Sequence, residues 1–179
     1  MHKPMSLYCR VTLAPARLEE LLNAPVKKVQ EFSDWKEWWL ASKTYGATHS
    51  ANDMPGNLDA LNFEDCPTVG DGIEAWTNAD EFFAEAEYDS GAGVWLFSIL
   101  EFTDSLREMT GMIALLRTAV SFSESADDFI VIARYLETGA NDTGAYLVFE
   151  KPQGRFVDEP SDQHDHEARV YFERRLKET

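Results

Sequence analysis

The sequence has few cysteines, no long apolar run and few basic residues, and each shortage excludes a class of protein. Its two cysteines, Cys9 and Cys66, stand in no C-x-x-C spacing, so neither a disulfide framework nor a zinc site is indicated. No stretch approaches the roughly 18 consecutive apolar residues of a membrane span. Arg10 and polar residues interrupt the first ten residues, which therefore lack the apolar core of a signal peptide. We expect a cytoplasmic protein without a membrane span.

The shortage of basic residues is confined to one part of the chain. The 179 residues include 32 Asp and Glu against 16 Lys and Arg, a net charge of −16 at pH 7. Residues 44–128 contain 17 acidic residues but only Arg107 and Arg117, whereas residues 1–43 and 129–179 are nearly balanced. This excess of one sign argues against direct binding to nucleic acid. It favours a basic protein partner, with a solvated acidic face that binds nothing as the alternative.

The order of the hydrophobic patterns predicts an α+β fold. Hydrophobic residues make up 44% of the chain, enough for one globular domain over residues 1–179. Apolar alternation or a continuous apolar run predicts strands at 7–13, 94–102, 129–136 and 145–150. Helical spacing predicts helices at 15–23, 33–40, 79–88, 105–122 and from 161 onward. We expect a mostly antiparallel sheet of about four to five strands with helices packed on it.

Two local patterns refine this picture. Ser105 and Glu108 have the S-x-x-E spacing of a capping box, which predicts a helix start there. Residues 45–75 hold four glycines and two prolines without sustained periodicity, so this segment is predicted to be a long acidic loop. Three tryptophans at helical spacing predict a buried helix face, namely Trp35, Trp38 and Trp39.

The predicted helix at 79–88 carries acidic residues with no basic neighbour. Glu81 and Glu85 repel each other at the i, i+4 spacing, and a cationic partner would relieve that repulsion. The acids near this helix, and the aromatic residues set among them, are the candidate partner-binding residues. They are Asp71, Glu74, Trp76, Asp80, Glu81, Glu85, Glu87, Tyr88 and Asp89.

No pattern of residues indicates catalysis or metal binding. His164 and His166 are two residues apart and point away from each other on a helix, so we expect a polar helix start and no metal site. We expect no cofactor and assign no catalytic residue. Carboxylates beside apolar residues could still perform acid-base chemistry if they lie together, which leaves a small carboxylate-dependent hydrolase as an alternative. The candidates are Glu74, Glu101 and Asp104.

In size, acidity and lack of catalytic motifs, the chain resembles the immunity proteins that bacteria make against their own cationic toxin domains. The resemblance depends on the acidic middle segment and on the aromatic residues within it, which are Trp76, Phe82, Phe83 and Tyr88. It implies stoichiometric occlusion of a cationic toxin domain, for example a nuclease domain. Carboxylates would pair with Lys and Arg of the toxin, and aromatic residues would anchor the interface. A DNA-mimic inhibitor, with acids in an extended regular track, is the other binding alternative.

Overall fold

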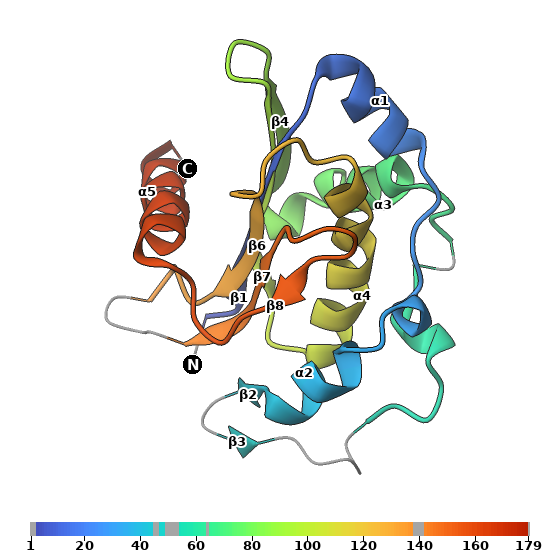
Figure 1. Cartoon of the computed structure of the whole chain (residues 1–179). Helices are drawn as coiled ribbons and strands as arrows, with labels where there is room; N and C mark the ends of the chain where they lie inside the picture. Colours follow the sequence, from blue (N-terminus) through green and yellow to red (C-terminus); the bar gives the residue numbers. More distant parts are fainter. Residues whose placement is uncertain (1–2, 45–46, 49–53, 64, 138–141, 179) are drawn as a thin grey trace.

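The computed structural model of the chain describes residues 3–44, 47–48, 54–63, 65–137 and 142–178 (Figure 1). Its strands are Met5–Thr12 (β1), Lys43–Thr44 (β2), Ala47–Thr48 (β3), Ala84–Asp89 (β4), Val94–Thr103 (β5), Phe129–Ala133 (β6), Thr143–Val148 (β7) and Arg155–Phe156 (β8). Its α-helices are Pro15–Asn23 (α1), Trp35–Ala41 (α2), Val69–Thr77 (α3), Leu106–Arg117 (α4) and Asp162–Glu178 (α5). Short 3-10 helices include Asp80–Phe82 (η4), which directly precedes β4.

Six strands form one antiparallel sheet, in the order β4-β5-β1-β6-β7-β8. The α+β prediction is confirmed, with six strands in this sheet where four or five were expected. The predicted hairpin of residues 129–136 and 145–150 is present as β6 and β7, each shorter or shifted by a few residues. Its connecting residues 138–141 lie outside the described part of the chain. Strands β2 and β3 pair separately.

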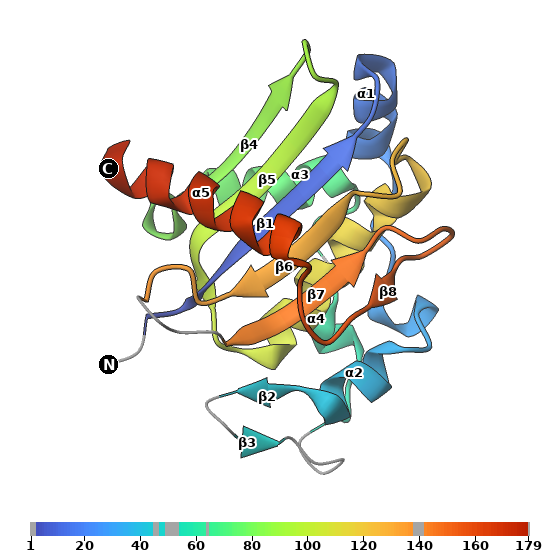
Figure 2. The same cartoon turned by 60° about the vertical axis from the view of Figure 1, so that its left-hand side comes forward.

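Helices cover both faces of this sheet. Figure 1 shows α1, α3 and α4 on one side and α5 on the other, and Figure 2 shows α5 running diagonally across the strands. The side chains of β1 alternate between the two layers: Leu7, Cys9 and Val11 face the core under α4, and Tyr8 faces the core under α5. The apolar run of β5 is therefore buried on both faces, as its sequence predicted.

The first correction concerns the end of the predicted loop of residues 45–75, because residues 69–75 belong to helix α3. Thr68 and Asp71 make a reciprocal capping box at its start. Gly70 and Gly72 suggested a loop, but they serve close helix packing. A Cβ on Gly72 would lie 2.2 Å from Leu115 Cδ1 of α4, and one on Gly70 would lie 2.8 Å from the Leu22 carbonyl oxygen near the end of α1. Glycine here lets α3 approach its neighbours.

The second correction concerns residues 79–88, which are not a helix. They form η4, then Phe83 in the left-handed region at φ 50°, then β4. The sequence Ala-Glu-Ala-Glu-Tyr-Asp also alternates with a period of two, and pairing with β5 selects the strand over the helical preference of Ala and Glu. Glu81 and Glu85 therefore do not stand one helical turn apart, so the predicted i, i+4 repulsion does not apply.

A third correction concerns the start of α4. Ser105 is its N-cap residue, but the Ser105 hydroxyl makes no capping hydrogen bond. Thr103 takes that place: its hydroxyl accepts a hydrogen bond from the Ser105 N–H at 2.9 Å and donates one to the Glu108 carboxylate. The predicted helix start is right, but the residue that organises it is the last one of β5.

Candidate functional site

The predicted partner-binding residues lie on three consecutive elements at the β4 end of the sheet. Asp71, Glu74 and Trp76 belong to α3, Asp80 and Glu81 to η4, and Glu85, Glu87, Tyr88 and Asp89 to β4. Helix α3 covers the sheet face opposite α5 (Figure 1). The carboxylate of Glu85 lies on the α5 face, where it pairs with Arg175. Acidic residues therefore flank the β4 edge on both faces of the sheet.

Six of these acidic side chains are exposed and, among the described residues, have no basic group within ion-pair distance. They are Asp71, Glu74, Asp80, Glu81, Glu87 and Asp89. The neighbouring Glu85 differs, because its carboxylate lies 2.9 Å from the Arg175 guanidinium. Arg107 and Arg117, the two basic residues of the acidic segment, are both on α4, and Arg117 is buried against Asp34. We call the six exposed acids, from Asp71 and Glu74 on α3 to Glu87 and Asp89 on β4, the acidic edge.

The aromatic residues of this region are half-buried and packed against the fold, except for one exposed ring. Trp76 packs against Phe82 and Phe102, with ring centroids 5.0 and 5.2 Å away. Tyr88 is half-buried, and its hydroxyl donates to the Leu13 carbonyl at 2.9 Å. Phe83 alone among these aromatics is well exposed, at 42%. A bulky residue with positive φ is rare, and such positions often lie at functional sites.

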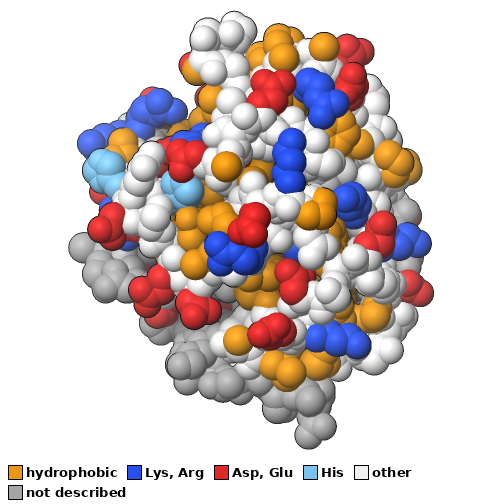
Figure 3. All heavy atoms as spheres, viewed as in Figure 1, with side chains coloured by type: hydrophobic (Ala, Val, Ile, Leu, Met, Phe, Trp, Pro, Cys, Tyr) orange, Lys and Arg blue, Asp and Glu red, His pale blue; other side chains and the backbone are white. Residues whose placement is uncertain are grey.

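A second acidic surface, which the sequence did not predict, lines a cleft at the opposite end of the sheet. The cleft has a volume of about 680 Å³ and lies between α2 and the segment that leads from β8 toward α5. Trp38 and Phe156 stack in its wall, with ring centroids 5.3 Å apart. Figure 3 shows acidic side chains beside a hollow at the lower left of the molecule. The acidic lining residues are Asp34, Glu37, Asp158 and Glu159.

These four acids were missed because they come from two distant parts of the chain. Each part is nearly balanced in charge when counted along the sequence, so neither stands out. Only the fold brings them together. An aromatic residue close to acidic residues, in Glu37-Trp38 and again in Phe156–Glu159, is the local signal that could have found them.

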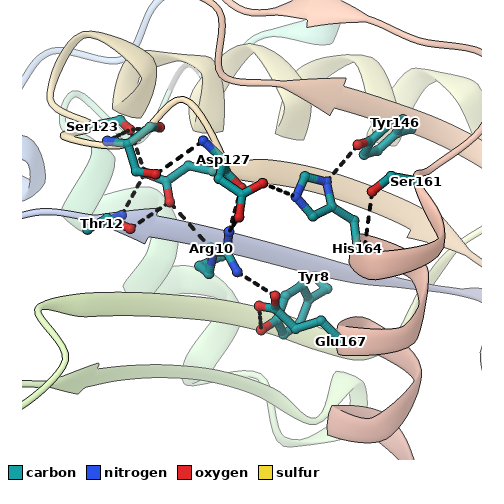
Figure 4. Close-up of polar contacts among 11 residues, drawn as sticks. Tyr8, Arg10, Thr12, Ser123, Asp127, Tyr146, Ser161, His164 and Glu167 are labelled. Atoms are coloured by element: carbon teal, nitrogen blue, oxygen red, sulfur yellow. Dashed lines mark hydrogen bonds and ion pairs between the residues drawn. The ribbon is translucent and has the colours of Figure 1, made fainter.

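A partly buried polar network ties α5 to the sheet beneath it (Figure 4). The guanidinium of Arg10 on β1 contacts three carboxylates, those of Asp127, Asp128 and Glu167. Asp128 is fully buried and accepts hydrogen bonds from the Thr12 N–H and hydroxyl, both at 2.7 Å. The carboxylate of Glu167 on α5 also accepts from the Tyr8 hydroxyl at 2.8 Å.

His164 belongs to the same network and is buried, whereas His166 is exposed. The spacing predicted that the two side chains face different ways, but not that His164 is buried. The Nε2 of His164 lies 3.0 Å from the Asp127 carboxylate and its Nδ1 lies 2.6 Å from the Tyr146 hydroxyl. The imidazole also stacks on Phe129, with ring centroids 3.8 Å apart. Both ring nitrogens and one ring face are therefore occupied, which is the environment of a structural histidine.

The network also shifts the ionisation of two of its members. Partial burial acts to raise the pKa of Asp127, but hydrogen bonds from His164 and Arg10 outweigh it and hold that pKa below its usual value. Burial, together with the neighbouring Glu167 carboxylate, raises the pKa of Tyr8 above its usual value. Tyr8 therefore stays a neutral hydrogen-bond donor, and Asp127 stays an anion.

The carboxylates considered for acid-base chemistry do not share one element. Glu74 is exposed on α3, Glu101 lies in β5, and Asp104 follows β5 and pairs with the buried Arg134 at 3.0 Å. In the described ranges, no three His, Cys, Asp or Glu side chains gather closely enough to hold a metal ion. Asp53 and Glu64, two acids of the predicted loop, lie outside those ranges.

Comparison with known protein families, with curated proteins and with solved structures finds no match for this chain. Among the described residues, no helix is both long and apolar enough to span a membrane.

Proposed function

We propose that this protein is a cytoplasmic immunity protein that neutralises a cationic toxin domain by binding to it stoichiometrically. The observation that carries the proposal is the acidic edge: six exposed carboxylates on α3, η4 and β4 without a basic neighbour among the described residues. Surface charges of one sign repel each other, and a cationic partner relieves that repulsion. Such charge also steers association, toward about 10⁸ M⁻¹s⁻¹ at low salt.

In this proposal the toxin contributes Lys and Arg side chains and the acidic edge contributes their counter-charges. Phe83 supplies the apolar anchor, because it is the exposed aromatic side chain beside these acids. The half-buried rings of Trp76 and Phe82 pack against each other at a tilt and hold η4 in place. The interface then has the usual composition, with a desolvated aromatic residue among polar groups.

The arrangement favours this function over the DNA mimic. A mimic needs an extended regular track of carboxylates. Among the described residues of the acidic edge and its neighbour Glu85, the regular row is the one on β4, where alternate residues share a face, and it holds Glu85, Glu87 and Asp89. Glu85 already pairs with Arg175, which leaves two unpaired charges in that row.

The proposal can be tested with a panel of purified cationic bacterial toxin domains, nuclease domains included. We expect one domain to form a stable one-to-one complex and to lose its activity in it. Reversing three charges of the acidic edge, Glu81→Lys, Glu87→Lys and Asp89→Lys, should abolish that inhibition.

The matched control reverses three exposed acids elsewhere, Glu19→Lys, Glu173→Lys and Glu178→Lys, and should leave inhibition intact. Equal loss in both variants would show that net charge alone matters and would contradict the proposed site. Similar affinity for DNA-binding proteins that are not toxins would favour the DNA mimic.

A further inference from the structure

Strand β4 is an open edge of the large sheet. Among the described residues it pairs with β5 alone, through six consecutive residues from Ala84 to Asp89. Figure 2 shows the β4–β5 hairpin at one end of the sheet, with no strand alongside the outer side of β4; the C-terminal turns of α5 cross in front of β4 near its start. The opposite edge differs, because β8 is only two residues long.

The hydrogen-bond register establishes which backbone groups of β4 point outward. The Leu100 N–H donates to the Phe83 carbonyl, so Phe83 and every second residue after it direct their backbone groups toward β5. The hydrogen bonds on the other side of β5 agree with this alternation. The Leu13 N–H, next to β1, donates to the Gly93 carbonyl, so the residues of β5 that bond to β1 alternate with those that bond to β4. The backbone groups that point away from β5 therefore belong to Ala84, Ala86 and Tyr88.

Side chains beside this edge leave room for another strand and select its charge. Ala84 and Ala86 are small and lie on one face, and Ala86 is exposed. On the α5 face stand the carboxylates of Glu85, Glu87 and Asp89, of which Glu85 pairs with Arg175. A neighbouring strand would place every second side chain beside these carboxylates.

We infer that the β4 edge binds an extended segment of a cationic protein as an additional strand, with Lys or Arg at alternate positions facing Glu87 and Asp89. The inference rests on the proposed function and names its mode of recognition. Backbone hydrogen bonds to Ala84, Ala86 and Tyr88 supply affinity, and the alternate basic side chains supply specificity. A second copy of this chain is a poor occupant, because its own β4 would bring carboxylates against carboxylates.

The experiment uses hydrogen exchange measured by NMR on the full chain, with a short synthetic peptide that alternates lysine and valine as the probe. In the free protein the N–H groups of Ala84, Ala86 and Tyr88 should exchange fast, and those of Glu85 and Glu87 slowly. Addition of the peptide should slow the three fast amides. The same peptide with its lysines kept and alternate backbone nitrogens methylated should not.

A variant tests the same contact from the protein side. Ala86→Pro removes one outward N–H and leaves the bonds to β5 in place, which an edge strand tolerates. It should weaken peptide binding by about tenfold, while Ala86→Ser should bind like the parent chain. If Ala86→Pro does not fold, the methylated peptide still decides the matter.

The outcomes separate this inference from the proposed function. A cationic toxin domain that binds through the acidic edge but leaves the three outward amides unprotected, and binds the proline variant normally, would overturn strand addition alone. Peptide addition at β4 without any toxin domain that binds would support strand addition and count against the immunity function. Equal binding of the methylated peptide would show simple electrostatic attraction and would overturn the inference.

Discussion

The guanidinium of Arg175 near the end of α5 lies 2.9 Å from the carboxylate of Glu85 on β4. The same guanidinium donates to the Phe83 carbonyl and to the Ser98 hydroxyl, both at 3.0 Å. One buried side chain of α5 thus fixes the start of the edge strand. Glu85 therefore belongs to the fold, whereas Glu87 two residues on is free of ion pairs with described residues.

The first prediction separates these two glutamates. Glu85→Lys should lower the thermal stability, because it sets a positive charge against the buried Arg175. Glu87→Lys should leave the melting temperature nearly unchanged, since exposed substitutions shift stability by about 0.5 kcal/mol or less. Thermal melts of the two variants under the same conditions check this. Equal destabilisation would show that the Arg175–Glu85 pair has no special role.

The second prediction concerns the buried Arg117 of α4. Its guanidinium bonds both oxygens of Asp34, at 2.7 and 2.9 Å, and lies 4.1 Å from the ring centroid of Phe32. Arg117→Ala should cost about 3–5 kcal/mol in the free energy of unfolding, because it removes the partner of a half-buried carboxylate and leaves a void. Urea denaturation measures this, and Arg107→Ala on the exposed side of the same helix serves as the control. A loss of unfolding free energy in Arg117→Ala no larger than that in Arg107→Ala would contradict this prediction.

The third prediction concerns acid stability. The pKa of Asp127 is lowered in the folded protein, so its contribution is fully present above the unfolded pKa of about 3.9. That contribution is lost as the pH falls through the lower folded value. Asp127→Asn should therefore destabilise the protein at neutral pH. The difference in stability between this variant and the parent chain should become smaller below about pH 4. Melting curves from pH 7 down to pH 3 test this. A difference that does not change with pH would show that the charge of Asp127 is unimportant.

The fourth prediction concerns binding kinetics. If the acidic edge steers a cationic partner, the association rate should fall steeply as salt rises, because salt screens exposed charges beyond about 10 Å at 0.1 M. Glu87→Lys with Asp89→Lys should slow association more than dissociation is accelerated. Stopped-flow mixing across ionic strengths measures both rates. An association rate independent of salt would remove the electrostatic argument.

The sequence predicted best where burial alone decides the structure. The apolar run of β5 and the spacing of Leu106, Met109 and Ile113 on α4 have one solution each, and both were predicted correctly. The sequence of residues 84–89 fits two structures. Its alternation of Ala and Glu has the period of a strand, whereas both residue types favour helices. Only the pairing partner β5 selects between them, and local sequence does not contain that partner.

The candidate site was predictable to the extent that it is local in sequence. The acids from Asp71 to Asp89 are clustered along the chain, and the fold keeps them at one end of the sheet. The cleft beside Trp38 joins residues more than a hundred positions apart, so charge counted along the chain did not reveal it. The pairing of Glu85 with Arg175 is equally non-local, and it removes Glu85 from the free charges.

The place of β1 in the sheet has a consequence for how the chain folds. β1 is the first strand in sequence, yet it lies between β5 and β6, which begin at Val94 and Phe129. The centre of the sheet therefore cannot form until segments separated by about 85 to 125 residues meet, and such non-local pairing slows folding to roughly milliseconds to seconds. Until then the β4–β5 and β6–β7 hairpins have no common strand, and loss of β1 would leave two separate ribbons in place of one sheet.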